Sequence, residues 1–358
     1  MSELTWRQVI ARRLARSHLL DPAPRTRVVD VVRDVGLIQA QVLSAAEIGL
    51  CLRVRGITAA DVRRELYQRR SLVKTWSLRG TLHLVPADEL AFWAAAARGL
   101  EPFWEAREWL AKHDLTPRRA GALFDAIADA LDGRCLTRAE RVDAAGEERL
   151  LSGWGELLAP LAFQGRLCFG EPRGANVTFV RADQWSSGRA EVDPADARRE
   201  VLRRYLRAYG PAKPADFQRW SGFGGDAARA LFDELAAELE QVRVDGMRTW
   251  LLKDDLEGFD RGARTIRLLP QYDAYVIGFR PREAIIPGAV KARIKQDRKG
   301  RFESVTGMSP LIVDGVVTGF WRRDKGQIEV EHVMPLPRGR KRELQAGMAR
   351  VQDALSST

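Results

Sequence analysis

In the N-terminal part of the chain, the spacing of hydrophobic residues changes once, from a helical to a strand-like pattern. Apolar positions recur every three or four residues across 6–19, across 26–35 and from residue 44, which is the spacing of one face of an α-helix. Apolar and polar residues then alternate over 72–85 around a turn near Arg79-Gly80, and this predicts a β-hairpin. Helices followed by a hairpin are typical of a winged helix.

The same order of elements recurs twice further along the chain. Helical patterns within 116–164 precede a second predicted hairpin over 167–180, whose turn is rich in glycine and proline. Helical patterns within 194–240 precede a third hairpin over 241–250, in which Asp245-Gly246 is the strongest turn signal of the chain. Three such units, each roughly 80 to 100 residues long, indicate a repeated module.

Short motifs predict where individual helices begin. A serine or threonine followed three residues later by an acid can form a capping box, in which each side chain accepts from the other residue's backbone N–H. This pattern occurs at Ser44–Glu47, Thr58–Asp61 and Thr137–Glu140. Thr116-Pro117 predicts another start, because proline suits the first helical position.

The C-terminal part returns to a strand-like pattern after Leu256. We expect strands over 264–279, over 311–321 with a turn at Asp314-Gly315, and over 327–333, followed by a terminal helix.

The predicted fold class is therefore α+β, with three tandem winged-helix units and a C-terminal β-rich extension. We place winged helix 1 at 1–90, winged helix 2 at 91–190 and winged helix 3 at 191–256. The extension with its terminal helix occupies 257–358.

The charge balance favours a polyanionic partner. The 358 residues carry a formal net charge of +10, which points to nucleic acid first and to an acidic membrane surface second. The most basic run either grips phosphate as a loop or is a solvated turn, and the sequence leaves both readings open. It contains Lys291, Arg293, Lys295, Arg298 and Lys299.

Several other classes lack support in the sequence. The three cysteines are widely spaced, and the four histidines form no cluster, so we expect neither a zinc site nor any other cofactor. No apolar run approaches the ~20 residues of a membrane span, and no signal peptide is visible. We therefore expect a cytoplasmic protein that does not bind membranes.

Two glutamines, Gln39 and Gln41, fall in the connector that Gly36 opens after the second helix. In an extended segment, residues two apart point to the same side, so their amides could converge on one water molecule. The alternative is that they cap backbone groups or face solvent. The chain has no GxSxG motif, Walker A motif or Rossmann glycine run, so any catalysis depends on amides, carboxylates or a single histidine.

Three segments together resemble the AlkZ-like DNA glycosylases, which are related to the YcaQ-type crosslink glycosylases. They are Gln39-Ala-Gln41, the segment 76–83 (WSLRGTLH) and the segment 268–278 (LLPQYDAYVIG), and the similarity extends over about residues 5 to 335. The resemblance implies a C-shaped monomer of three winged helices that binds double-stranded DNA, with Gln39 and Gln41 as catalytic residues. The YcaQ-type branch has an acid in place of the second glutamine, so Gln41 places this chain on the AlkZ side.

The resemblance also implies a reaction. Family members hydrolyse the N-glycosidic bond of N7-alkylated purines, and some unhook interstrand crosslinks left by genotoxic natural products. The role would be DNA repair or self-resistance to an antibiotic. Because the motif contains no lysine to form a Schiff base, we expect a monofunctional enzyme that leaves an abasic site.

Further residues of the two longer segments are candidates for contacts with DNA or the lesion. Arg79 and His83 could line a lesion pocket or bind phosphate, although a histidine within a strand is more often packed. Trp76 could stack on a base or fill the core. Tyr272 and Asp273 could position water or DNA, or form hydrogen bonds at a strand end.

Two other functions fit parts of the pattern. A winged-helix chain can be a non-catalytic regulator, but such regulators usually dimerise on two half-sites, and no heptad seam is present here. The chain could also be a scaffold that has lost its active site, against which the intact Gln39/Gln41 pair argues.

Overall fold

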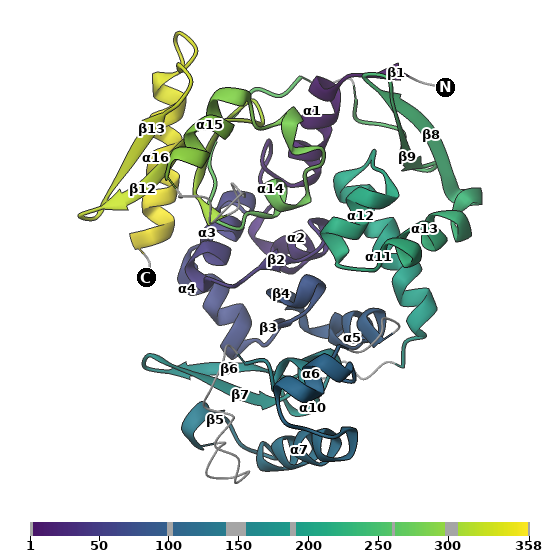
Figure 1. The fold of residues 1–358 in the computed structure, drawn as a ribbon. Helices are drawn as coiled ribbons and strands as arrows, with labels where there is room; N and C mark the ends of the chain where they lie inside the picture. The colour runs from purple at the N-terminus through teal and green to yellow at the C-terminus, as the bar shows by residue number, and fades with distance from the viewer. Residues whose placement is uncertain are drawn as a thin grey trace. The chain divides into compact units, whose positions relative to one another are not determined.

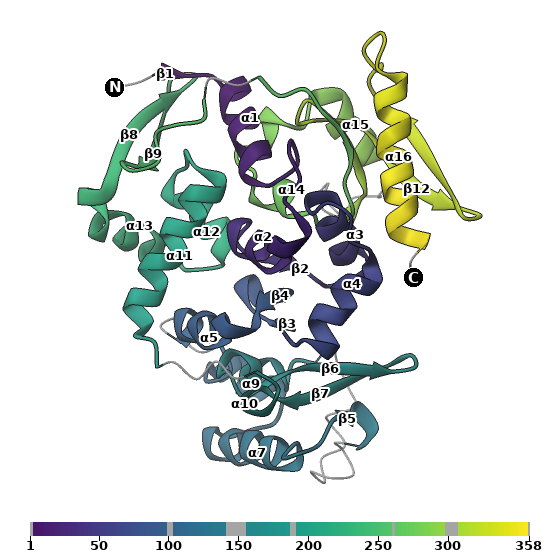
Figure 2. The ribbon, with the colours of Figure 1, turned by 180° about the vertical axis from the view of Figure 1, so that it is seen from behind.

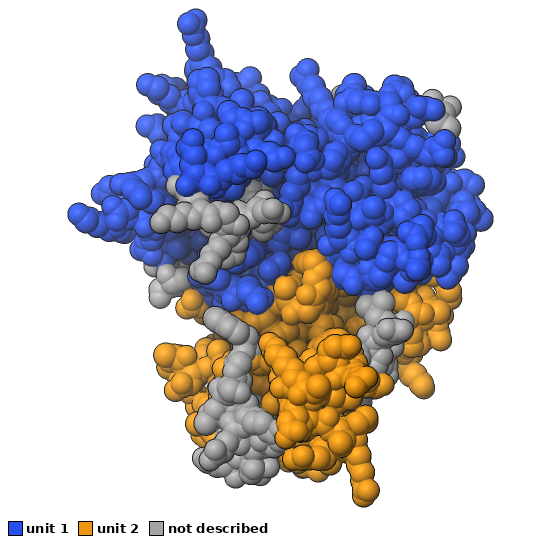
Figure 3. Space-filling view, in the orientation of Figure 1, with its two compact units in different colours: residues 1–62, 202–358 blue, residues 63–201 orange. Residues whose placement is uncertain are grey.

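The computed structural model describes residues 3–98, 103–140, 155–186, 191–259, 262–297 and 307–356. The chain forms two compact units, which Figure 3 draws in different colours. Unit 1 combines residues 1–62 with 202–358, and unit 2 comprises residues 63–201. The division into four segments expected from the sequence stays a prediction.

Unit 1 begins with a set of short helices (Figure 1). Strand β1 (Glu3–Leu4) leads into α1 (Trp6–Arg16), which Thr5 and Gln8 cap reciprocally. A 3₁₀ turn (Arg25–Arg27), α2 (Val28–Asp34), β2 (Ile38–Gln39), α3 (Leu43–Arg53) and α4 (Ala59–Arg63) follow. The helices predicted over 6–19 and 26–35 are confirmed, each somewhat shorter than expected.

Two of the three predicted capping boxes form. The Thr58 and Asp61 side chains each accept from the other residue's backbone N–H, and Thr137 and Glu140 do the same. The prediction at Ser44 is wrong, because α3 starts at Leu43 with Val42 as its N-cap. Ser44 is therefore already inside the helix, where its side chain cannot act as the cap.

The third predicted unit consists of three helices followed by a β-hairpin. Ala212 pairs with Trp250, so the helices are bracketed by strand pairing, and Asp245 and Gly246 have positive φ as a two-residue hairpin turn requires. The elements are α11 (Pro194–Tyr209), α12 (Pro214–Ser221), α13 (Gly225–Glu234), β8 (Leu239–Val244) and β9 (Met247–Leu252). Strand β1 joins the hairpin in parallel to β8.

The C-terminal strands form an antiparallel sheet in chain order. They are β10 (Ile266–Leu268), β11 (Pro310–Val313), β12 (Val316–Asp324) and β13 (Gln327–His332). The turn at Asp314-Gly315 is confirmed by the positive φ of both residues. Helix α16 (Lys341–Ser356) packs against β10 and α3, as Figure 2 shows from behind.

Two expectations for this region are wrong. The pattern over 264–279 is a strand only as far as Leu268, and the rest forms helix α14 (Ala274–Gly278), because the Asp273 side chain accepts from the Tyr275 N–H as an N-cap. The basic run that starts at Lys291 is no loop over its described part, since it lies on α15 (Gly288–Asp297). Arg298 and Lys299 lie outside the described residues.

Unit 2 contains the other two predicted hairpins, and both are confirmed. Its strands run in the order β4 (Leu82–Pro86), β3 (Leu72–Trp76), β6 (Leu167–Arg173), β7 (Asn176–Arg181) and β5 (Leu136–Thr137). Its helices are α5 (Leu90–Arg98), α6 (Arg107–Lys112), α7 (Pro117–Ala130), α9 (Ala159–Phe163) and α10 (Ala182–Trp185). Thr116 caps α7 as expected.

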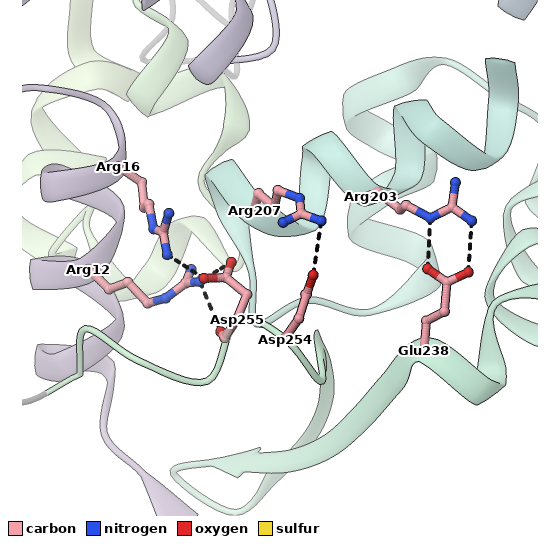
Figure 4. A network of polar contacts seen from close by, with 7 residues as sticks. All are labelled: Arg12, Arg16, Arg203, Arg207, Glu238, Asp254 and Asp255. Carbon is pink, nitrogen blue, oxygen red and sulfur yellow. Dashed lines mark hydrogen bonds and ion pairs between the residues drawn. The ribbon is translucent and has the colours of Figure 1, made fainter.

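Arginines of α1 connect it to segments far along the chain. Arg12 is buried and donates to Asp255 and to the Gly210 carbonyl, and Arg16 reaches the other oxygen of Asp255 (Figure 4). Arg13 donates to the Pro211 and Arg280 carbonyls. Burial lowers the pKa of Arg13 to about 10, which leaves it charged at neutral pH. Arg12 and Arg13 thus serve the interior of unit 1, whereas Arg16 is exposed.

A fully buried ion pair joins α3 to α14. The two guanidinium NH₂ groups of Arg53 lie 2.8 and 2.7 Å from the two carboxylate oxygens of Asp273, and Nη1 also donates to the Gly49 carbonyl. Both side chains are 1% exposed. Although burial alone would lower the pKa of Arg53, the adjacent Asp273 carboxylate raises it, so the guanidinium stays charged.

Breaking this pair is expected to destabilise the protein strongly. Arg53→Met should lower the free energy of unfolding by about 3 to 5 kcal/mol, because it leaves the Asp273 carboxylate buried without its cation. Chemical denaturation measures the loss. The double variant Arg53→Met/Asp273→Leu should cost clearly less than the sum of the single changes, since neither charge is then left alone.

Arg322→Met is the matched control. Arg322 pairs with Glu329 but is 76% exposed, so its loss should cost little stability. Equal losses for Arg53→Met and Arg322→Met would contradict the assignment.

Candidate active site

The connector that carries the two glutamines begins with a tight helix end. Gly36 and Leu37 both have positive φ, at 67° and 81°. Their N–H groups donate to the Arg33 and Val32 carbonyls at 3.1 and 3.0 Å, which satisfies carbonyls at the end of α2. Glycine takes this conformation easily and leucine does not, so the backbone at Leu37 is strained just ahead of the motif.

Exposure alternates along the motif. Ile38 and Ala40 are buried, whereas Gln39 is partly exposed and Gln41 is exposed. With Ile38–Gln39 in strand β2, this alternation is that of an extended segment whose even positions face the interior. The connector predicted for Gln39 and Gln41 is confirmed, and both amides lie on its outward side.

Two aromatic side chains hold the start of the connector. The Tyr209 hydroxyl lies 2.7 Å from the Val35 carbonyl and 3.2 Å from that of Ala274. The Trp220 ring packs so closely against Gly36 that a Cβ there would lie 2.9 Å from it. Helix α3, which follows the motif, is held in turn by the buried Arg53–Asp273 pair. The connector is therefore anchored on both sides within unit 1.

In unit 2, the first hairpin brings Arg79 and His83 together. His83 is buried, with Nδ1 2.9 Å from the Thr81 carbonyl and Nε2 3.3 Å from an Arg79 NH₂ nitrogen. Burial, reinforced by the positive charge of Arg79, lowers the pKa of His83 to about 3. The imidazole is thus neutral, donates through Nδ1 and accepts from Arg79 through Nε2, which fixes the guanidinium at the hairpin turn.

Trp76 of the same hairpin lies in the core of unit 2. Its ring is 4.9 Å from that of Phe169 and stacks on Phe179 with an interplanar angle of 8°. A Cβ at Gly155 would lie 2.7 Å from the ring, so the packing is tight. Of the two roles expected for Trp76, the packing favours the structural one over stacking on a base.

Tyr272 and Asp273 are adjacent in sequence but differ in surroundings. Tyr272 is partly exposed and has a positive φ of 59°. Asp273 is buried, and its two carboxylate oxygens accept from Arg53 and from the N–H of Tyr275. These contacts give Asp273 a structural task in place of the direct contact with DNA or water that the sequence suggested.

The described part of the basic run presents its charges unevenly. Lys291 and Lys295 are exposed on α15, whereas Arg293 pairs with Glu331 of β13 at 2.6 Å. Two of these three cations thus face solvent, where a phosphate could reach them.

The described residues contain no candidate metal site and no candidate membrane span. Over those stretches, no group of three or more His, Cys, Asp or Glu side chains could hold a metal ion. No helix among them is long and apolar enough to cross a membrane.

Helices and β-hairpins in a chain with a net charge of +10 fit a nucleic-acid-binding protein, and the two outward glutamines are candidates for its reaction centre. A family model described as "DNA glycosylase AlkZ-like" matches residues 32–354. The chain belongs to the AlkZ-like DNA glycosylase family and is therefore a DNA glycosylase.

Two similar proteins from Streptomyces sahachiroi support this membership. One, named interstrand DNA cross-link repair glycosylase, is 34% identical over 338 residues, which cover 88% of this chain and 87% of that protein. A solved structure of the DNA glycosylase AlkZ matches with a TM-score of 0.82 and 30% identity, over 99% of this chain and 98% of that one. These likenesses confirm the family resemblance, and they do not support the regulator or scaffold alternatives.

Residues that position the motif escaped the sequence analysis. Arg53 is the clearest case, although a signal was present, since Arg53 and Glu47 are the two charged residues of the otherwise mostly apolar α3. Such a charge is expected to have a buried partner. Tyr209 and Trp220 gave no comparable signal, because an aromatic residue on a helix usually only fills the core.

The buried His83 should make stability depend on pH. The unfolded chain takes up this proton near pH 6.5, and the folded protein only near pH 3, so acidification through this window favours unfolding. Between about pH 7.5 and pH 5 the cost is about 2 kcal/mol.

Denaturation curves at several pH values test this expectation. His83→Gln should lose stability at neutral pH but show a weaker decline on acidification than the natural protein. His332→Gln, at an exposed histidine of β13, should leave the decline unchanged. An identical decline in His83→Gln would mean that the imidazole is not held neutral.

Proposed function

We propose that this glycosylase hydrolyses the bond between deoxyribose and a cationic N7-alkylpurine in double-stranded DNA, with Gln39 and Gln41 as catalytic residues. One observation carries the assignment, which is that the two amides lie on the outward side of an extended, anchored connector while Ala40 between them is buried. Two amides held in this way can contact a single water molecule.

The charge of the substrate explains why amides suffice. Alkylation at N7 leaves the purine with a positive charge, so the base departs without being protonated by a general acid, which ordinary glycosidases require. As the bond from C1′ to N9 breaks, its electron pair neutralises the base. The oxygen of a water molecule then bonds to C1′, and a proton of that water passes to solvent. The products are a free base and an abasic site.

The glutamines supply position and not basicity. A carboxamide oxygen accepts a hydrogen bond from water, and the NH₂ group donates to the water oxygen or to a phosphate. Neither group is a strong base at neutral pH. Most of their effect therefore comes from holding water beneath C1′ and from the carbonyl dipoles that face the developing positive charge of the sugar.

Interstrand crosslinks formed through N7 belong to the same chemical class. Each crosslinked purine is cationic, so the same hydrolysis would release one strand at a time. The name of the relative, interstrand DNA cross-link repair glycosylase, supports this extension of the substrate range. A lesion from a self-produced antibiotic would make the role self-resistance, and a lesion from another alkylating agent would make it repair. We propose the crosslink as the substrate common to both roles.

The Arg79 guanidinium is proposed to bind a DNA phosphate near the lesion. It stands at a hairpin turn, and its orientation is set by neutral His83. An arginine with a fixed direction is well suited to phosphate oxygens, because it presents several donors in one plane. Lys291 and Lys295 add exposed positive charge. We expect the protein to act as a monomer.

Replacing either glutamine should abolish most cleavage without preventing binding. Gln39→Ala and Gln41→Ala should each slow single-turnover release of the base on the order of 100-fold, because water is no longer positioned. Affinity for the same duplex, measured by fluorescence anisotropy, should change little. Gln345→Ala, at an exposed glutamine of α16, is the control and should retain full activity. A parallel loss of binding would assign the amides to recognition.

The enzyme should discriminate by the charge of the damaged base. DNA with N7-methylguanine should be cleaved, whereas DNA with an undamaged guanine or a neutral adduct should not, because an amide cannot protonate a leaving group. Strand breaks after alkaline heating report each abasic site. Borohydride should trap no covalent complex. Cleavage of neutral adducts at comparable rates would require an acid that this proposal does not contain.

A further inference from the structure

The β8–β9 hairpin of unit 1 presents two unlike faces. Val242, Val244 and Leu251 belong to a buried cluster with Leu4 and Val9. The opposite face carries exposed arginines beside a partly exposed tryptophan, namely Arg243, Arg248 and Trp250. One face thus stabilises the unit, and the other is available for a different task.

The two arginines stand directly opposite each other. Arg243 on β8 and Arg248 on β9 are register partners, so their side chains leave the sheet from neighbouring positions on the same face. Like charges at such positions destabilise a hairpin. The arrangement is unfavourable for folding alone, and an anion placed between the two guanidinium groups would relieve it.

The same arginines line a cavity of about 630 Å³ at the ends of α12 and α13, which we name the wing groove. Its other polar and aromatic lining includes Lys213, Gln218, Arg229 and Trp250. Among the described lining residues there is no aspartate or glutamate. The groove therefore combines four cationic side chains with the apolar surface of an indole ring.

Four carboxylates adjoin the lining residues, and each accepts a hydrogen bond from the protein. Asp245 accepts from the Trp6 N–H, Glu3 from the Gly246 N–H and Asp216 from the Lys213 N–H. Asp226 pairs with Arg229 and reduces its charge. Lys213, Arg243 and Arg248 remain as the main sources of positive potential.

Helix α13, by contrast, has the wrong charge for the nucleic acid. In many winged helices the third helix enters the major groove. Here its exposed positions include Asp226, Asp233 and Glu234 against the single cation Arg229. Phosphates would be repelled from this surface and attracted to the wing groove beside it.

We infer that the wing groove, whose lining includes neither Gln39 nor Gln41, binds a backbone phosphate of the DNA. The arginine pair and Lys213 would hold the phosphate oxygens, and Trp250 would contact the adjoining sugar. This inference rests on the proposed action on duplex DNA. It means that the third winged helix contacts the DNA backbone through its β8–β9 hairpin and not through α13.

The salt dependence of binding to an undamaged duplex tests the inference. Each phosphate contact contributes a slope of about 0.9 to a plot of log affinity against log salt concentration. For Arg243→Gln/Arg248→Gln the slope should become shallower by about one to two, and affinity should fall at least threefold at moderate salt. Single-turnover cleavage of N7-methylguanine DNA at saturating protein should keep its rate.

Arg219→Gln/Lys253→Gln is the matched control. It removes the same charge from exposed positions of the same winged helix that do not line the groove. If both double variants reduce the slope equally, only net charge matters and the inference fails. An unchanged slope in Arg243→Gln/Arg248→Gln also overturns it. If the natural protein does not cleave N7-methylguanine DNA, the proposed function is refuted. The salt dependence of DNA binding would still show whether the wing groove binds phosphate.

Discussion

The Arg53–Asp273 ion pair is the contact on which the architecture around the glutamines depends. It joins the helix that follows Gln41 to a segment more than two hundred positions later, where the same carboxylate caps α14. Two buried charges are costly to remove from water, and only precise geometry offsets that cost. Such a pair therefore holds α3 and α14 in one arrangement. An apolar contact would permit small displacements of the two helices, but the ion pair disfavours them.

Buried arginines are a wider theme of unit 1, and they alter how the composition should be read. Arg12, Arg13 and Arg53 are among the largest fully buried side chains, and their donors bind carbonyls and carboxylates of distant segments. A guanidinium suits this role because it offers five donors in a plane. Part of the net charge of +10 is thus structural. The surface available to DNA is set by particular cations and not by the total.

Local turn chemistry made much of the fold predictable. Asp245-Gly246 and Asp314-Gly315 identified their hairpins, and Gly36 identified the end of α2 and hence the connector with both glutamines. In one failed prediction, a distant partner decided the outcome. The segment after Leu268 has a strand-like composition, but Asp273, held by Arg53, starts a helix there. Likewise, nothing near Asp273 in the sequence indicates a buried cation, so its role could not be assigned.

The strained backbone at Leu37 has a consequence for how the enzyme can change. This residue combines a left-handed conformation with an interior side chain, and the two requirements conflict. Glycine would relax the backbone but leave a void, and a β-branched residue would fill the space but resist the torsion. Few substitutions satisfy both, so the step before the two proposed catalytic amides has little room for neutral drift. Among related enzymes, the residues that surround this position should therefore vary more than the position itself.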